Sequence, residues 1–143
     1  MNIQVLNKLH LYQITVIFSV IFALLGFSYN VWRMEVSEEN SNIRTACFEM
    51  LINLSSLEQQ IYAAHYDGDK KQGNPRNGWV TVGLIADLSA LTDDAVKKES
   101  IALKETWSAH WETIPTSKNS VDKLVGSIDS VRAKIKYLLS SLE

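Results

Sequence analysis

The chain has 143 residues, which is room for one modest domain besides a membrane segment. Its 14 Lys and Arg residues are nearly balanced by 16 Asp and Glu residues, whereas a nucleic-acid-binding domain usually shows a basic excess or a basic stripe. Composition therefore argues against a nucleic-acid partner. Two prolines and six glycines favour an all-α fold, and the single cysteine excludes an intramolecular disulfide.

The first predicted element is a membrane helix. Residues 14–32 read ITVIFSVIFALLGFSYNVW and carry no charge. As an α-helix this stretch would be about 28 Å long, close to the hydrocarbon thickness of a bilayer. Tyr12 before it and Trp32 at its end resemble the aromatic belts of the two membrane interfaces. We therefore predict a transmembrane helix over 14–33 after a short N-terminal tail over 1–13, with the lipid bilayer as a partner.

The rival interpretation of this segment is a cleaved signal peptide. The tail offers only Lys8 and the amino terminus as positive groups, and no small-x-small cleavage site follows the apolar run. An uncleaved signal-anchor is therefore predicted. Arg33 and Arg44 follow the span, so the positive-inside count is tied. Because a short tail ahead of a signal-anchor commonly stays cytoplasmic, we expect a single-pass protein of the bacterial inner membrane with a periplasmic soluble domain.

A second helix is predicted over 34–66, within a soluble domain over 34–143. From Ile43 onward apolar residues are spaced 4-3-4-3-4-3, the pattern of a coiled coil or bundle helix. This seam consists of Ile43, Cys47, Met50, Leu54, Leu57, Ile61 and Ala64, and we expect Phe48 and Leu51 to widen it. The seam offers a surface for self-association or for docking a protein partner, and it predicts that Cys47 is a small buried hydrophobe.

No Gly or Pro interrupts residues 27–67, so the membrane helix is expected to continue directly into the helix over 34–66. Such a helix can transmit a shift through the bilayer or serve as a plain stalk.

Three further helices are predicted over 75–91, 93–114 and 118–142. Asn74 and Pro75 form a typical helix start, with Asn as N-cap and Pro in the first turn. The segment that follows is apolar on most faces, which predicts a central helix. Thr92, Asp93 and Asp94 cap the next helix, Pro115 ends it, and Ser117 or Ser120 caps the last one.

The last two helices carry regular apolar stripes. Their members are Val96, Leu103, Trp107, Trp111 and Ile114 in one helix, and Val121, Leu124, Ile128, Val131, Ile135, Leu138 and Leu142 in the other. Four amphipathic helices joined by short connections predict an antiparallel four-helix bundle. A membrane helix that runs into such a bundle resembles the sensory modules of bacterial chemoreceptors in architecture, although these 143 residues contain no second span and no signalling domain.

Metal and cofactor sites are not indicated. Asp67-Gly68-Asp69 begins like a calcium loop, but Lys71 and Gln72 occupy positions that need an oxygen ligand and a glycine. His65 and His110 lack the Glu three residues earlier that a di-iron bundle requires. The chain has no G-x-S-x-G, no glycine-rich phosphate loop and no H-E-x-x-H, so we expect no cofactor and no enzymatic activity.

Six residues remain as a candidate interaction or ligand surface. Trp107, His110 and Trp111 share one helical face, and Trp79 starts the neighbouring helix. These aromatic residues form either a core layer or a pocket or interface anchor, since Trp is common at binding hot spots.

The other two candidates are charged. Asp87 lies in the most apolar segment, where an unpaired carboxylate would be costly, so we expect an ion pair with Arg76 or with a lysine of the 67–78 loop. The predicted function is a non-enzymatic subunit or adaptor of a membrane-associated complex. The alternative is a sensor of a small ligand or of the envelope state, with a site around Trp79, Trp107 and Asp87.

Overall fold

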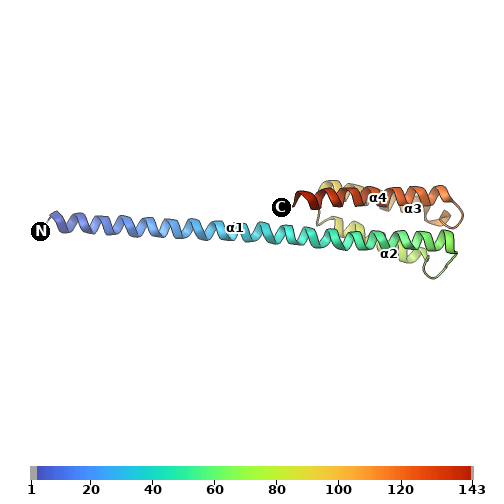
Figure 1. Ribbon diagram of the computed structural model, residues 1–143, viewed down its shortest axis with the longest axis horizontal. Coiled ribbons are helices and arrows are strands. Elements are labelled where there is room, and N and C mark those ends of the chain that lie inside the picture. Colours follow the sequence, from blue (N-terminus) through green and yellow to red (C-terminus); the bar gives the residue numbers. More distant parts are fainter. Residues whose placement is uncertain (1–2, 143) are drawn as a thin grey trace. The chain divides into compact units, whose positions relative to one another are not determined.

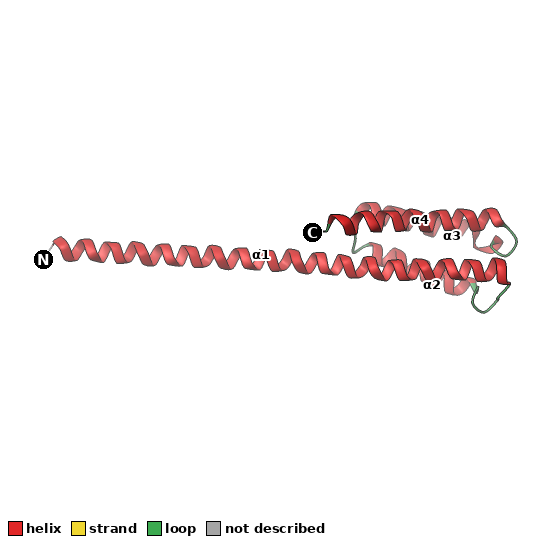
Figure 2. Ribbon diagram, in the orientation of Figure 1, coloured by secondary structure: helices red, strands yellow, loops and turns green. Residues whose placement is uncertain are grey.

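The computed structural model describes residues 3–142, with side chains from residue 10 onward. Within this range all regular structure is helical and there is no strand, as the all-α prediction required (Figure 2). The helices are α1 (Ile3–Tyr62), α2 (Pro75–Ser89), α3 (Asp94–His110) and α4 (Lys118–Ser141), with a π-helical turn at Ala63–Asp67 and a 3-10 turn at Trp111–Thr113 (Figure 1). The chain divides into two compact units, Met1–Glu39 and Asn40–Glu143, which are described separately.

The first unit is the N-terminal part of α1. Its large apolar side chains, from Leu11 to Val36, are each between 40 % and 70 % exposed. Thr15 donates a hydrogen bond to the carbonyl of Leu11, and Ser19 donates to that of Thr15, both at 2.9 Å. Among the described residues this is the one helix long and apolar enough to cross a membrane. The side chain of Lys8, used above for the orientation, lies outside the described residues.

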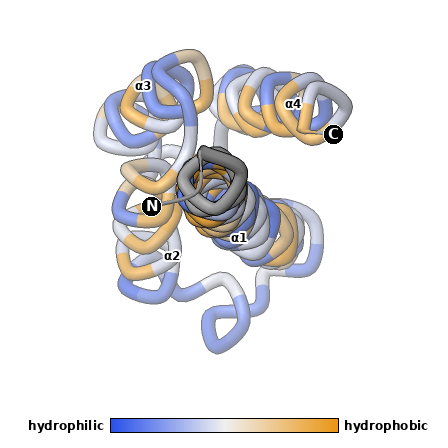
Figure 3. The backbone as a smooth tube through the Cα atoms, turned by 90° about the vertical axis from the view of Figure 1, so that its left-hand side faces the viewer, coloured by the Kyte–Doolittle hydropathy of each residue, from blue (hydrophilic) through white to orange (hydrophobic). Residues whose placement is uncertain are grey.

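The second unit has a core formed by all four helices. The predicted seam of α1 supplies Cys47, Met50, Leu54, Leu57 and Ile61, each 0 % exposed. The predicted stripes of α3 and α4 are confirmed as well, with these members buried: Val96, Leu103, Trp107, Ile114, Val121, Leu124, Ile128, Val131, Ile135 and Leu138. Hydrophobic and hydrophilic positions alternate around each of these helices (Figure 3).

Two expectations about burial are wrong. Phe48, which we expected to widen the seam, is 57 % exposed, because at 100° per residue it lies almost opposite the core-facing side of α1. The second concerns α2, which we expected to be a central helix. It buries one face through Val82 and Ile85, while Val80 and Leu84 are exposed. α2 packs mainly against α3, so apolar composition alone did not make it central.

The predicted helix starts are observed. The side chain of Asn74 accepts a hydrogen bond from the backbone N–H of Arg76, with Pro75 in the first turn of α2. The side chain of Asp93 accepts from the backbone N–H of Val96, and that of Ser117 accepts from Ser120. These caps fix where α2, α3 and α4 begin.

The helix ends differ from the predicted ranges. The helix expected to reach residue 91 ends at Ser89, and the one expected to reach 114 ends at His110, followed by the tighter turn Trp111–Thr113. Pro115 has no N–H to continue an α-helical ladder, which fits the tightening of the last turn. Beyond α1, Gly68 takes a left-handed conformation with φ of 62°, and its N–H donates to the carbonyl of Ala63.

The helices of the second unit are joined by packing and by a few polar contacts. α2 packs against α3, and α3 packs against α4. α1 is tied to α4 by the ion pair between Glu58 and Arg132, whose oxygen and nitrogen are 2.5 Å apart. In the π-helical turn after α1, the Nδ1 atom of His65 lies 2.6 Å from the carbonyl oxygen of Ile114. These contacts bring the segments around residues 60–65 and 107–115 together.

Candidate functional site

The six residues singled out from the sequence fall into two sets. Trp79, Trp107 and Trp111 lie together where α2 meets the end of α3, and His110 lies at the same end of α3. Arg76 and Asp87 are exposed residues of α2 and do not join this group. The structure thus brings the aromatic residues together and separates them from the two charges.

The three tryptophans form an edge-to-face cluster. The ring of Trp79 is 6.5 Å from that of Trp107 and 6.5 Å from that of Trp111 between centroids, at interplanar angles of 88° and 68°. Trp107 is 2 % exposed, whereas Trp79 and Trp111 are half-buried. Edge-to-face pairs stabilise by about 0.5–1.5 kcal/mol beyond the area they bury. The cluster is therefore part of the core through Trp107 and is partly exposed through Trp79 and Trp111.

Gly78, which the sequence did not single out, sets how closely α2 approaches Trp107. A Cβ atom at this position would lie 2.1 Å from Cζ2 and 2.2 Å from Cη2 of Trp107. No side chain fits there unless the indole moves. The signal in the sequence was a glycine within the first turns of a helix that carries a Trp at the next position, since a helical glycine often marks close packing.

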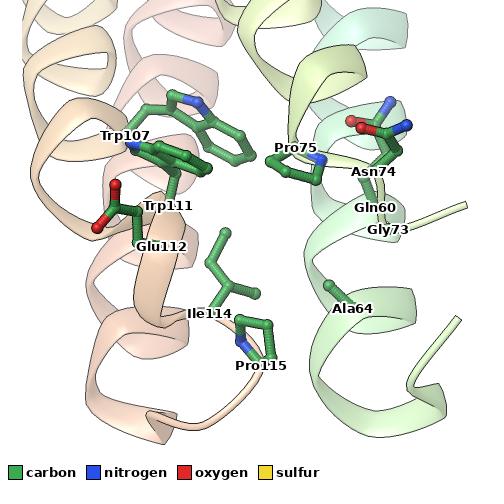
Figure 4. A pocket seen from close by; sticks show the side chains of 10 residues that line it. All are labelled: Gln60, Ala64, Gly73, Asn74, Pro75, Trp107, Trp111, Glu112, Ile114 and Pro115. Carbon is green, nitrogen blue, oxygen red and sulfur yellow. The ribbon is translucent and has the colours of Figure 1, made fainter. Parts of the chain in front are cut away.

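A cavity of about 100 Å³ lies beside this cluster (Figure 4). Its walls are mostly apolar and come from α1, the loop before α2, and the segment from Trp107 to Pro115. The lining residues are Gln60, Ala64, Gly73, Asn74, Pro75, Trp107, Trp111, Glu112, Ile114 and Pro115. Gly73 passes so close to the π-helical turn after α1 that a Cβ would lie 2.6 Å from Cα of Ala64. The loop can close this side of the cavity only because residue 73 has no side chain.

Two buried polar atoms of the cavity-lining residues have no hydrogen-bond partner. They are Oε1 of Gln60, an acceptor, and Nε1 of Trp107, a donor. A buried polar group left unsatisfied costs about 1–3 kcal/mol. No sequence pattern pointed to Gln60, because a single Gln beside an apolar seam is ordinarily exposed to solvent.

His110 belongs to a small polar group at the start of α4. Its Nδ1 atom is 3.5 Å from Oγ of Ser120, which is also 2.8 Å from Oγ1 of Thr113 and 3.2 Å from Oγ of Ser117. Ser120 is 4 % exposed. Within the described residues no carboxylate joins these four, so the group lacks the acid that orients a histidine in a nucleophilic triad. The contacts instead join the end of α3 to the start of α4.

The ion pair expected for Asp87 is absent from the described residues, and that expectation is wrong. Asp87 is exposed, as is Arg76, and neither side chain takes part in a salt bridge. Solvent hydrates the carboxylate, so burial never imposes the cost that would have required a partner. Both residues lie on the outer side of α2, on the same face as the exposed Val80 and Leu84.

The outer side of α1 carries a second heptad-spaced stripe. Its residues, which we call the outer seam, are Ser41, Thr45, Phe48, Ile52, Ser55, Gln59 and Tyr62, with spacing 4-3-4-3-4-3, and all are exposed. Phe48 and Ile52 are 57 % and 64 % exposed and border an open groove on α1 with Leu51, Ser55, Ser56 and Gln59. The apolar seam predicted above faces the core of its own unit, so the outer seam is an exposed side of α1 within the second unit.

Glu58 and Cys47 of α1 both have shifted pKa values. Burial raises the pKa of Glu58, but hydrogen bonds from Arg132 and Tyr62 and the positive charge of Arg132 outweigh it, so the net pKa lies below its usual value. Burial raises the pKa of the Cys47 thiol, and the negative charge of Asp93 adds to the effect. Cys47 is 0 % exposed, as predicted, which makes it an unreactive thiol.

Neither metal ligands nor similarity to known proteins indicates a function. Among the described residues no group of three His, Cys, Asp or Glu side chains is placed to hold a metal ion. The side chain of Asp69 instead accepts hydrogen bonds from the backbone N–H groups of Lys71 and Gln72, at 2.8 and 3.0 Å. The chain matches no protein-family model, no curated protein and no solved structure.

Proposed function

We propose that the chain is a membrane-anchored, non-enzymatic subunit or adaptor that associates with a second copy of itself through the outer seam of α1. In this proposal residues 14–33 are an uncleaved signal-anchor in a bacterial inner membrane, and the second unit is an antiparallel four-helix bundle on the periplasmic side.

The exposed apolar surface of the first unit supports the anchor. Apolar side chains on all faces of a helix would be covered by lipid, and a helix in lipid must satisfy its polar groups internally. Thr15 and Ser19 do so through carbonyls of their own helix. The successive packing of α2 on α3 and α3 on α4, together with the Glu58–Arg132 ion pair from α1 to α4, supports the bundle.

The observation that carries self-association is the charge pattern beside the outer seam. With Thr45, Ile52 and Gln59 at a positions and Ser41, Phe48, Ser55 and Tyr62 at d positions, Arg44 occupies a g position and Glu49 the following e position. In a parallel pair of helices the g residue of one copy meets the next e residue of the other. Arg44 therefore faces Glu49 of the second copy, twice by symmetry, and both residues are exposed.

Anchoring favours the same arrangement. Two copies inserted in one membrane with the same topology have their bundles on the same side, and tethering raises their effective concentration. A seam that is half polar, with Ser41, Thr45, Ser55 and Gln59, suits such assisted association. The exposed face of α2, which carries Arg76, Val80, Leu84 and Asp87, remains available to the complex in which the subunit acts.

Cysteine cross-linking in membranes tests the proposal. An Ile52→Cys variant should form a disulfide-linked dimer on mild oxidation, because equivalent a positions face each other in a parallel pair. The native Cys47 is buried and should not contribute. The matched control is Ser108→Cys, at an exposed position of α3, which should stay monomeric. Equal cross-linking of both variants, or none at residue 52, would contradict the proposal.

A charge reversal then tests the register. Arg44→Glu should reduce cross-linking at residue 52, and the double variant Arg44→Glu with Glu49→Arg should restore it. Restoration would not follow if Arg44 acted only within its own chain, where its guanidinium donates to the carbonyl of Leu142.

The proposed orientation has its own test. A phosphatase and a fluorescent reporter fused separately to Glu143 in a bacterial host should give phosphatase activity and no fluorescence. The reverse result would place the bundle in the cytoplasm and leave the self-association proposal standing.

A further inference from the structure

The open groove on the outer side of α1 lies at the middle of the outer seam. Six residues line it: Phe48, Leu51, Ile52, Ser55, Ser56 and Gln59. Five of them are exposed and Leu51 is half-buried, so the groove faces away from the core of the second unit. It is therefore open to a second helix.

The outline of the groove matches the packing of a parallel pair of helices. There each a or d side chain of one helix inserts into a hole formed by four residues of the other. The hole for Ile52, an a residue, consists of Phe48, Leu51, Ile52 and Ser55 of the second copy. The hole for the d residue that follows consists of Ile52, Ser55, Ser56 and Gln59. Together these two holes contain the six groove residues and no others.

Three polar side chains of the outer seam are satisfied within their own chain. Thr45 and Ser55 each donate a hydrogen bond of 3.0 Å to the carbonyl oxygen four residues earlier. The hydroxyl of Tyr62 donates to Oε1 of Glu58 at 2.9 Å. These hydroxyls keep their hydrogen bonds when a second helix covers them, so covering them costs little.

Gln59 differs from these three residues. Its side chain is exposed, and it forms no hydrogen bond with any other residue that the structure describes. It occupies the a position one heptad after Ile52, so a second copy that covers Ile52 also covers Gln59. A covered amide without a hydrogen bond is costly. The second copy must therefore supply a donor and an acceptor at this position.

We propose that the two Gln59 side chains, in the self-association on which this proposal rests, hydrogen-bond to each other and limit the assembly to two copies. Equivalent a residues face each other in a parallel pair. A carboxamide has both donors and an acceptor, so two equal amides complement each other. In a trimer three amides would meet, and a reciprocal pair would leave the third without a partner.

The surroundings of Gln59 in the pair suit an amide. By the same packing its side chain enters a hole formed by Ser55, Glu58, Gln59 and Tyr62 of the second copy, which are all polar. The hole for Ile52 instead includes Phe48 and Leu51. The groove thus buries apolar side chains at one end, and Gln59 specifies the pairing at the other.

Sedimentation equilibrium of the full chain in density-matched detergent tests the proposal. The unchanged chain should be dimeric. Gln59→Ile should associate about tenfold more tightly and form trimers as well, because a polar a residue specifies the number of strands at a cost in stability. Gln59→Asn keeps the amide and should stay dimeric. The matched control is Gln72→Ile, at an exposed position outside the outer seam, which should behave as the unchanged chain does.

A Gln59→Ile variant that remains strictly dimeric, with the affinity of the unchanged chain, would overturn the proposal. If this variant fails to fold, nitrogen-15 NMR of the unchanged chain in lipid nanodiscs decides. The side-chain amide protons of Gln59 should exchange with water about tenfold more slowly than those of Gln72, because the second copy covers only the former. Equal exchange rates would likewise refute the amide pair.

The amide pair and the self-association can fail separately. If Ile52→Cys forms the cross-linked dimer but Gln59→Ile changes neither affinity nor stoichiometry, the self-association stands and the role of Gln59 is wrong. If the unchanged chain is monomeric and residue 52 does not cross-link, both proposals are wrong and the groove is open to a different protein.

Discussion

Residues 14–32 and 43–61 belong to the same helix, and both are rich in large apolar side chains, yet they meet different surroundings. In the first stretch Phe, Leu, Ile and Val occur on every face and remain exposed. In the second they concentrate on one face, and Cys47, Met50, Leu54, Leu57 and Ile61 are fully buried. Angular distribution around the helix, more than total hydrophobicity, separates the surface proposed for lipid from the surface that builds a protein core.

The largest expected effect is a change in the cell fraction that contains the protein. Deleting residues 14–32 should move the protein entirely from the membrane fraction to the soluble fraction, because these residues carry the proposed anchor. Fractionation with an antibody against the second unit measures it. Leu24→Ala is the control and should remain in the membrane. If the variant without residues 14–32 stays in the membrane fraction, another part of the chain must bind the membrane.

Truncation of one leucine in each stretch sharpens the comparison energetically. Leu54→Ala should lower the free energy of unfolding of the second unit by about 2–5 kcal/mol, since it leaves a cavity at a position that is 0 % exposed. Leu24→Ala, at a position that is 61 % exposed, should change it by less than about 0.5 kcal/mol. Denaturation of the detergent-solubilised chain followed by tryptophan fluorescence gives both values. Similar losses at the two positions would refute the distinction.

Two glycines of α2 test packing against the tryptophan cluster. Gly78→Ala should destabilise the second unit by about 1–3 kcal/mol, because the added Cβ overlaps the indole of Trp107. Gly83 has open space around it, so Gly83→Ala should stabilise α2 by up to about 1 kcal/mol through helix propensity. The near-ultraviolet circular dichroism of the tryptophans should change in the first variant only. If Gly78→Ala leaves the stability unchanged, α2 approaches Trp107 of α3 less closely than the structure shows.

The smallest expected effect concerns the ion pair between α1 and α4. Arg132→Met should cost about 1 kcal/mol at neutral pH, since the pair is only partly buried. The folded state lowers the pKa of Glu58, so this contribution is present above the ordinary glutamate pKa and is lost as the pH falls below about 4.3.

This effect is measured by the unfolding free energies of the Arg132→Met variant and the unchanged protein at neutral and acidic pH. The control is Lys136→Met, at an exposed position. A difference between Arg132→Met and the unchanged protein that persists in acid would assign the loss to the packing of the arginine stem.

The local features were largely predictable from the sequence. Asn74, the segment from Thr92 to Asp94, and either Ser117 or Ser120 were predicted to cap helices. In the structure Asn74, Asp93 and Ser117 are the caps, because their side chains accept hydrogen bonds from backbone groups two or three residues further along. The buried stripe of α4 followed from its spacing alone. The candidate site was only partly predictable. Three tryptophans pointed to a cluster, but Gln60 and Gly78 became relevant only through residues far away in the sequence.

The sequence by itself determined the all-α class, the helix starts and the core-facing residues, because these depend on interactions within a few residues and on helical periodicity. Only the tertiary structure decided which apolar faces remain uncovered. It left Phe48 and Ile52 exposed on α1 and Val80 and Leu84 exposed on α2, and it placed Asp87 in solvent. It also formed the cavity between Gln60 and Trp107. Exposure and cavities are properties of how several helices fit together, and no single helix carries that information.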